Sequence, residues 1–329
     1  MASGPAPLGS APPGTGRPNA RKMVGAIAAS VSAAFLWATY YLFVLLLPGV
    51  GDVVVTVVPF AAGGTCFLLL LAAQGSPPRE WTVGWLTPGT LLRAGLLLFL
   101  QLDVVLATRS AGAVDTSLAT LLGDVVVTPL LVALSLGTGS ERLRWRTFQG
   151  GLALSSAGAV IAIVGGRTLG GLGPGPVLLL LPLPFLVAGY FVVVARAQET
   201  EPMPRLVSQA TLTAAAMGVL LLPFFPLGGT SPGVSPVEAA LLLVALGVTS
   251  FFLAPWAYFA AAARLTLVVP AVLQALIPVF TLLLVVLFAL APTSEFAWVG
   301  VPIAFAGSVL AVWDPRRRSP AALPGPRSG

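Results

Sequence analysis

The sequence predicts an all-α integral membrane protein with ten transmembrane helices, arranged as two inverted five-helix repeats. Three observations lead to this fold class: the composition, the distribution of positive charge, and a similarity between the two halves of the chain. Of the 329 residues, 57% are hydrophobic and only 9% are charged, whereas a soluble domain carries about 25% charged residues. So few charged side chains cannot cover a water-facing surface, which places the chain in a lipid bilayer.

Apolar runs separated by Pro, Gly or charged residues supply the predicted helices, because a helix needs about 20 apolar residues to cross the hydrocarbon. The loops between the runs are short, so successive helices run antiparallel and no extramembrane domain fits between them. The ten predicted spans are 24–47, 53–73, 89–107, 114–137, 148–165, 176–196, 206–226, 237–261, 265–290 and 297–313.

The segment before the first span is rich in Pro, Gly, Ser and Ala and ends in basic residues, which is typical of a disordered cytosolic tail. The run that follows is long enough to span the bilayer, so we expect a permanent helix rather than a cleaved signal peptide. The predicted division is a tail at 1–22, repeats at 23–166 and 174–313, and a second disordered cytosolic tail at 314–329.

The positive charges test the number of spans. With the N-terminus in the cytosol, 15 of the 17 Lys and Arg residues, Arg93 among them, fall in cytosolic segments. Only Arg109 and Arg167 fall outside. This asymmetry predicts an even number of spans, with both termini on the cytoplasmic side of the cell membrane. It also accounts for the formal charge of +6 without a nucleic-acid partner.

The two halves resemble each other at a nearly constant separation. Residues 35–44, FLWATYYLFV, align with 185–194, FLVAGYFVVV, at a separation of 150 residues. Residues 151–162, GLALSSAGAVIA, align with 300–311, GVPIAFAGSVLA, at 149. Five spans are an odd number, so the second copy inserts upside down, and such inverted repeats are typical of secondary transporters. Both copies of the second pair carry small residues at four-residue spacing, which favours close helix packing.

Two further segments carry a resemblance to a known family. The turn SERL at 140–143 is similar to the Gly-Glu-Arg-Leu turn of EamA-type members of the drug/metabolite transporter superfamily, and IPVFT at 277–281 is similar to their Ser-Pro-Val-Phe-Thr segment. The resemblance covers roughly 24–313. It implies a ten-helix exporter or permease for a small metabolite, with a central cavity lined by the first, third, fourth, sixth, eighth and ninth helices.

Asp124 lies in the middle of the fourth predicted span, where a charged side chain costs about 2.5–3.5 kcal/mol. Ser117, Thr120, Asp124 and Thr128 recur at helical spacing, so they share one face of a helix. This stripe predicts a cavity wall that binds solute or a coupling proton. In the alternative reading, Asp124 is protonated and bonds a neighbouring helix. The repeat aligns Asp124 with Pro278, so Asp124 departs from the family pattern and inherits no role from it.

Asp103 and Gln101 lie in the third span, and we include both among the candidate binding residues. They are two residues apart and so lie on different faces. Asp103 is near the outer end of its span, where a charge is cheaper. An outer ion pair of Arg109 with Asp103 or Asp115 is therefore an equally open reading.

Aromatic residues and one glutamine complete the candidate set. Deep Trp and Tyr side chains need partners for their N–H and O–H groups, so pocket lining and simple packing are both open for them. Gln274 matches Thr120 in the repeat at an offset of 154, which predicts that it faces the same cavity. These further candidates are Trp37, Tyr40, Tyr190, Trp256, Tyr258 and Gln274.

The functional hypothesis is a secondary transporter, with export favoured, that moves a small metabolite, amino acid or drug-like solute by alternating access. Asp124, with Asp103 as a second candidate, would bind a cation or a proton and couple its movement to transport. The alternative is an intramembrane enzyme acting on a lipid-like substrate, which is disfavoured because the chain has no His, no paired Asp motif and no phosphate loop. We expect no enzymatic activity, cofactor or bound metal. The expected partners are a small-molecule solute and the lipid bilayer, and a homodimer is left open.

Overall fold

The computed structural model describes residues 20–75, 85–128, 131, 146–164, 174–197, 201–229, 233–265, 268–291 and 293–312. The regular elements in these segments are helices, and one isolated antiparallel bridge joins Val50 and Gly228. The tails before Ala20 and after Val312, the SERL turn and most of the fourth span beyond Thr128 lie outside the described residues. Since α1 begins at Ala20, the last three residues of the predicted first tail are helical.

The first half of the chain contains helices in each of its five predicted spans. The fourth of these passes from an α-helix into a π-helical turn, η1. The elements are α1 (Ala20–Leu46), α2 (Asp52–Ala73), α4 (Pro88–Ser110), α5 (Ala113–Leu122), η1 (Gly123–Val127) and α8 (Arg146–Val164).

The second half is more interrupted, because turns or π-helical segments divide four of its predicted spans. The elements are α9 (Pro174–Leu180), α10 (Leu183–Ala197), α11 (Met203–Val219), η2 (Leu222–Phe224), α12 (Pro236–Leu246), η3 (Gly247–Leu253), α13 (Ala254–Leu265), α14 (Val268–Leu273), α15 (Leu276–Leu287) and α16 (Glu295–Val312).

Six helical stretches of the described chain are long and apolar enough to cross a membrane. Shorter apolar helices occupy Ala113–Leu122, Leu276–Leu287 and Glu295–Ala311. The all-helical class is therefore confirmed, whereas the ten-span count and the inverted repeat stay predictions. The six long stretches are Met23–Leu46, Asp52–Ala73, Pro88–Ser110, Arg146–Val164, Pro174–Val194 and Pro236–Leu265.

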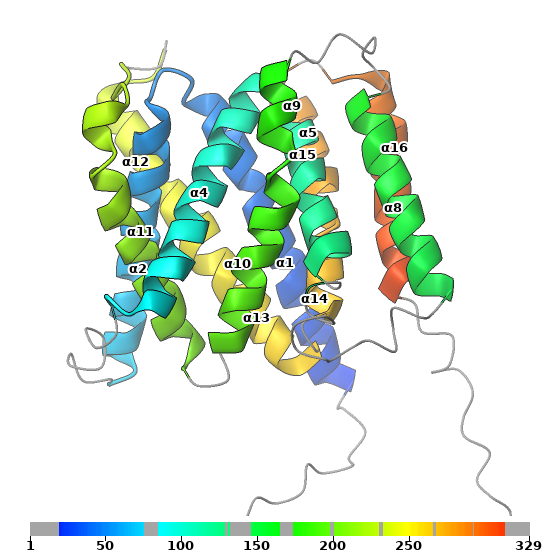
Figure 1. The fold of residues 1–329 in the computed structure, drawn as a ribbon, viewed down its shortest axis with the longest axis horizontal. Helices are drawn as coiled ribbons and strands as arrows, with labels where there is room; N and C mark the ends of the chain where they lie inside the picture. The colour runs from blue at the N-terminus through cyan, green and yellow to red at the C-terminus, as the bar shows by residue number, and fades with distance from the viewer. Residues whose placement is uncertain are drawn as a thin grey trace, which may run out of the picture.

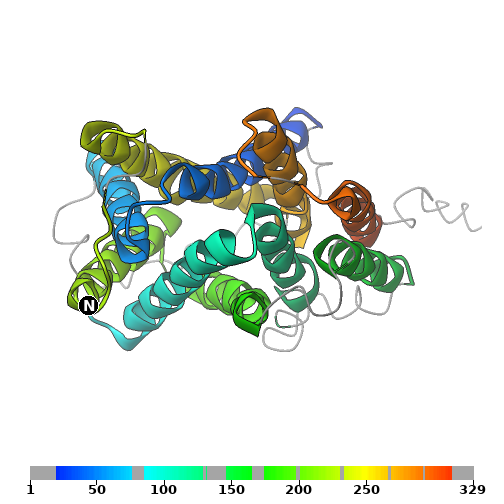
Figure 2. The same ribbon diagram turned by 90° about the horizontal axis from the view of Figure 1, so that it is seen from above.

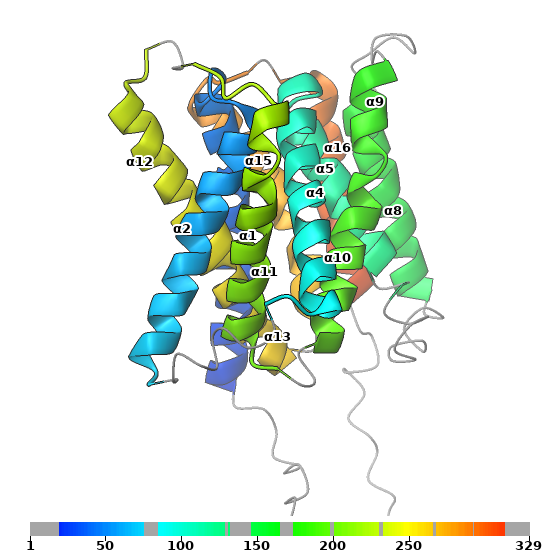
Figure 3. The same ribbon diagram turned by 60° about the vertical axis from the view of Figure 1, so that its left-hand side comes forward.

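The helices run side by side in one bundle (Figure 1). Ala20 at the start of α1 and Val312 at the end of α16 lie at the same end of the bundle, here called the near end. Seen from above, the bundle is elongated, with α8 and α16 together at one extremity (Figure 2). The view in Figure 3 shows α2, α11 and α12 on the opposite side of the molecule. The middle of the bundle thus lies between helices from both halves of the chain.

Helices α8 and α16 pack so closely that their backbones are in contact. A Cβ atom added to Gly151 would lie 2.4 Å from the Ala311 nitrogen, and one added to Gly158 would lie 2.3 Å from the Ala304 nitrogen. The small residues at four-residue spacing therefore make the close contact that the sequence predicts. Larger residues at these two positions would force the helices apart.

At the far end of the bundle, opposite Ala20 and Val312, two loops are joined by backbone bonds. The Gly51 N–H donates to the Leu227 carbonyl (3.0 Å), and the Gly229 N–H donates to the Gly49 carbonyl (2.8 Å). A Cβ on Gly228, which has a φ of +75°, would lie 2.4 Å from the Gly49 oxygen. Glycine is thus required here by both conformation and space.

Arg109, at the end of α4, holds the first of these loops. Its guanidinium pairs with Asp52 and donates to the carbonyls of Leu47 (2.7 Å) and Val50 (2.8 Å). Segments 47–52 and 226–229 together with Arg109 are called the clasp below. The clasp links the first half of the chain to the second. The alternative reading, in which Arg109 pairs with Asp103 or Asp115, is wrong, because Arg109 pairs with Asp52 at the start of α2.

Candidate functional site

A pocket with a volume of about 100 Å³ lies in the middle of the bundle. All six helices that the family resemblance implied contribute to it, and α11 adds a seventh. Its wall is mainly apolar and aromatic, with a few polar groups. The lining residues are Trp37, Tyr40, Tyr41, Leu97, Leu100, Gln101, Val104, Thr120, Asp124, Val187, Tyr190, Phe191, Val207, Thr211, Ser250, Phe251, Pro255, Phe259 and Ile277.

Two π-helical turns, η1 and η3, shape the pocket from opposite halves of the chain. In η1 the Thr128 N–H bonds the Gly123 carbonyl, and in η3 the Ala254 N–H bonds the Thr249 carbonyl. In each case the next residue in the sequence is proline, which has no N–H and clashes with the carbonyl four residues earlier. A widened turn relieves that clash, and such turns are frequent at functional sites.

In a π-helical turn, a carbonyl accepts a hydrogen bond from the N–H five residues later. For the Ser250 carbonyl that residue is Pro255, which has no N–H, so this carbonyl lacks a backbone donor. The indole N–H of Trp37 donates to this carbonyl at 3.1 Å. In return, the Ser250 hydroxyl donates to the Leu36 carbonyl at 3.3 Å. This reciprocal pair of hydrogen bonds connects α1 with η3 at the pocket wall. Trp37 is therefore placed by a carbonyl that proline exposes.

Asp124 lies in η1 and lines the pocket with only 4% of its surface exposed. Its Oδ1 atom has no hydrogen-bond partner among the described residues, and neither does the Thr128 hydroxyl. A buried polar atom without a partner costs free energy. Asp124 therefore offers a free acceptor to whatever enters the pocket.

The other hydroxyls of the predicted stripe are already engaged. The Ser117 hydroxyl donates to the Val114 carbonyl (2.7 Å), and the Thr120 hydroxyl donates to the Ser117 carbonyl (2.9 Å). The Thr120 Oγ1 atom also pairs with the Tyr41 hydroxyl at 3.0 Å. Because a hydroxyl has one hydrogen, Tyr41 is the donor in that pair. Thr120 thus faces the pocket, whereas Ser117 and Thr128 are buried but are not part of its lining.

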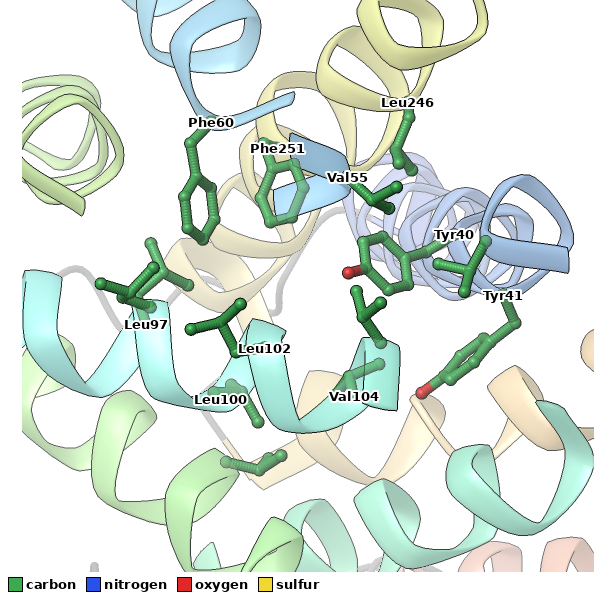
Figure 4. Packing of buried hydrophobic residues seen from close by; sticks show 14 of the residues in the cluster. Tyr40, Tyr41, Val55, Phe60, Leu97, Leu100, Leu102, Val104, Leu246 and Phe251 are labelled. Atoms are coloured by element: carbon green, nitrogen blue, oxygen red, sulfur yellow. The ribbon is translucent and has the colours of Figure 1, made fainter. Parts of the chain in front are cut away.

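Aromatic rings form the other wall of the pocket. The ring centroids of Trp37 and Tyr258 lie 5.4 Å apart, and those of Phe191 and Tyr258 lie 5.2 Å apart. Tyr40 meets Phe251 edge to face at 5.8 Å, and Figure 4 shows both rings among apolar side chains of α2, α4 and α12. These separations are typical of stabilising aromatic pairs. The hydroxyls of Tyr40 and Tyr258 have no partner among the described residues.

Several candidates named from the sequence lie outside the pocket lining. Tyr258 packs behind Trp37, and Asp103 is half-buried on another face of α4. The Gln274 amide donates to the Pro270 carbonyl (3.0 Å) and to the Ser30 hydroxyl (3.4 Å), so its amino group joins α14 to α1.

Trp256 is the clearest correction, because 49% of its surface is exposed on the outside of α13. The sequence placed it beside Tyr258, but two residues apart on a helix means different faces. The interfacial role usual for Trp suits this position better than pocket lining.

The pocket also contains residues that were not predicted from the sequence, among them Phe191, Thr211, Ser250 and Phe251. Pro255 could have pointed to Ser250, since a proline leaves carbonyls one turn earlier without their backbone donors.

Arg93 is a further correction. The sequence counted it as a loop charge, but it is buried inside α4 with 4% exposure. Within the described residues, no cluster of three or more His, Cys, Asp or Glu side chains could hold a metal ion.

Comparisons with known proteins agree with this architecture. The sequence model of the EamA-like transporter family matches residues 175–313, which confirms the resemblance over the second half of the chain. No curated protein sequence matches the chain. A protein of known crystal structure is 22% identical, covers 88% of this chain and 98% of its own, and superimposes with a TM-score of 0.69. At this identity the match supports the fold alone.

The family match over residues 175–313 and the apolar helices together suggest a multi-pass membrane protein. The family that matches this part of the chain is one of transporters.

Proposed function

We propose that the chain is a secondary transporter that moves a small metabolite, amino acid or drug-like solute by alternating access through the central pocket. The proposed direction is export across the cell membrane, with both termini in the cytoplasm. The proposed partners are the solute and the surrounding lipid, without nucleic acid. The proposed contacts to the solute come from the pocket-lining members of the candidate set: Trp37, Tyr40, Gln101, Thr120, Asp124 and Tyr190.

The observation that carries this proposal is the position of Asp124. It is a buried carboxyl with an unpartnered oxygen, in a pocket whose walls come from both halves of the chain. An ionisable residue at membrane depth that faces a cavity is a functional site by default. A proton or a positively charged group of the solute would complete its coordination. Binding at Asp124 is thereby coupled to the packing of η1 against the second half.

The clasp supports alternating access. It joins loops of both halves at the far end through backbone bonds and the Arg109–Asp52 pair, and we propose that it closes the pocket on that side. A transporter that opens alternately must break such a seal in its other state. We therefore propose that the structure represents the state closed toward the far end, which is the extracellular side in the proposed orientation.

The test uses the purified full chain in proteoliposomes. A thermal-shift screen of metabolites and cationic drugs at two pH values first identifies a solute, because preferential binding stabilises the folded state. Transport of that solute is then measured across a pH gradient. Asp124→Asn is expected to abolish the pH dependence. Asp103→Asn removes a carboxyl outside the pocket lining and is expected to keep it. Full pH-dependent transport by Asp124→Asn contradicts the proposal.

A further inference from the structure

Arg93 is a buried cation in the second turn of α4, exposed to only 4%. The arginines at the near ends of α10 and α13, Arg196 and Arg264, are exposed. Arg93 is therefore unlike a charge that merely marks the cytosolic side of a membrane protein. Its guanidinium lies inside the bundle, where an uncompensated charge is expensive.

The contacts of the guanidinium leave its charge uncompensated. Its Nη2 group donates to the Thr90 hydroxyl at 3.0 Å, and Thr90 Oγ1 lies 3.0 Å from the hydroxyl of the N-cap residue Thr87. A Cβ on Gly89 would lie 3.7 Å from Nη1, so the side chain folds back along the first turn of α4. The buried Nε group has no partner, and no carboxylate in the described part of the chain pairs with Arg93.

The start of α4 adds to this positive potential. The amino end of a helix carries a partial positive charge, which favours anions and disfavours cations. The first turn of α4 contains no acidic residue. A guanidinium folded over this turn is thus opposed by both burial and the helix dipole. Pro88 has no N–H, and the N–H groups of Thr90 and Leu91 donate to Thr87, so the donors that can meet an anion here are chiefly those of the guanidinium.

This site adjoins the pocket. Arg93, Leu97 and Val104 are spaced by four and seven residues and so lie on one face of α4, and the last two line the pocket. Arg93 and Val207 lie within two turns of the near ends of their helices. Arg93 is not itself among the lining residues and lies one turn beyond Leu97, toward the near end.

We propose that Arg93, beside the first turn of α4, binds a carboxylate carried by the transported solute. This inference rests on the proposed function, since it names the chemical class of the solute. A guanidinium can hold a carboxylate with two parallel N–H···O bonds. The apolar and aromatic walls then receive the body of the solute, which extends from Arg93 toward Asp124. The solute is accordingly a small organic acid with an apolar or aromatic body.

The experiment compares two compounds of one shape. Phenylacetate carries the carboxylate, and phenylacetamide is its neutral counterpart. Dissociation constants are measured by calorimetry on the full chain in nanodiscs of uncharged phosphatidylcholine. Wild type is expected to bind phenylacetate at least tenfold more tightly than phenylacetamide. Arg93→Gln should reduce that ratio to near one, and Arg93→Lys should keep part of it. Arg264→Gln, which removes an exposed charge from the same end, should leave the ratio unchanged.

Equal binding of both compounds by wild type, or an unchanged ratio in a folded Arg93→Gln protein, overturns the carboxylate site and leaves the transport pocket standing. Failure of both compounds to bind counts against the pocket and the carboxylate site together. A repeat in nanodiscs that contain phosphatidylglycerol separates the two sources of anion. If the anionic lipid weakens phenylacetate binding only when Arg93 is present, a lipid headgroup occupies the site and the assignment to solute is overturned.

Discussion

The hydroxyls of Ser155 and Ser308 lie 3.1 Å apart at the centre of the α8–α16 contact. The Ser308 hydroxyl donates to the Ala304 carbonyl at 2.9 Å, so Ser155 is the donor in the pair. Glycines flank this bond on both sides and bring the two backbones together. The contact joins the last helix of the first half to the last helix of the second.

Two adjacent glycines on α8 allow a matched stability test. A Cβ on Gly151 would lie 2.4 Å from the Ala311 nitrogen, whereas one on Gly150 would meet nothing within 4 Å. Gly151→Ala is expected to destabilise the protein by about 1–3 kcal/mol through overpacking. Gly150→Ala should be neutral or stabilising by up to about 1 kcal/mol, because Ala favours the helix. Thermal unfolding in detergent measures both, and equal effects contradict the close contact.

Trp37 and Pro255 should be energetically coupled, although they do not bond each other. Pro255→Ala supplies an N–H that can satisfy carbonyls of η3, so the Ser250 carbonyl no longer depends on the indole N–H. Trp37→Phe is expected to cost about 0.5–1.5 kcal/mol in wild type and less in the Pro255→Ala background. A double-mutant cycle on unfolding free energies measures the difference. Strict additivity argues against the role of the proline.

Tyr41 and Tyr258 differ in whether the hydroxyl is bonded. Tyr41 donates to Thr120 at 3.0 Å, whereas the buried Tyr258 hydroxyl has no partner among the described residues. Tyr41→Phe should destabilise the protein by about 0.6 kcal/mol, the average for a hydrogen bond inside a membrane protein. Tyr258→Phe should leave stability unchanged or raise it. If thermal unfolding shows the reverse order, the assignment of a bonded Tyr41 hydroxyl and an unbonded Tyr258 hydroxyl is wrong.

The clasp predicts a graded effect on access to the pocket. Val104→Cys in a Cys66→Ala background places one thiol in the pocket wall. Arg109→Gln should raise its labelling by an impermeant maleimide from the far side several-fold. Asp52→Asn should raise it less, because the bonds from Arg109 to Leu47 and Val50 remain. Arg264→Gln serves as the control for charge. No increase with Arg109→Gln means that the clasp does not seal the pocket.

Much of the fold could be predicted from the sequence, because long apolar runs and small-residue spacing depend only on local periodicity. The membrane class, the helical segments and the close packing of α8 and α16 follow from these signals, but the pairing of these two helices with each other does not. Every predicted span contains a helix of the structure, although turns interrupt several spans and the fourth is described only in part.

The site was less predictable, because it depends on which loops meet and where helices widen. The partner of Arg109 is Asp52, which reaches it through the fold of the loop after α1. The burial of Arg93 depends on neighbouring helices and not on its own segment. Periodicity assumes a uniform helix, and the π-helical turns η1 and η3 alter the register on either side of them. The prolines after these turns predict an irregularity, but not its form.

The composition of the clasp has a consequence for diversification. Much of its adhesion comes from main-chain atoms between Gly49–Gly51 and Leu227–Gly229, which substitutions of pocket side chains do not alter. The residues proposed to bind the solute are therefore separate from those proposed to close the far end. Substitutions in the aromatic wall around Tyr40 and Tyr190 should change which solute binds and leave the backbone bonds of the clasp intact.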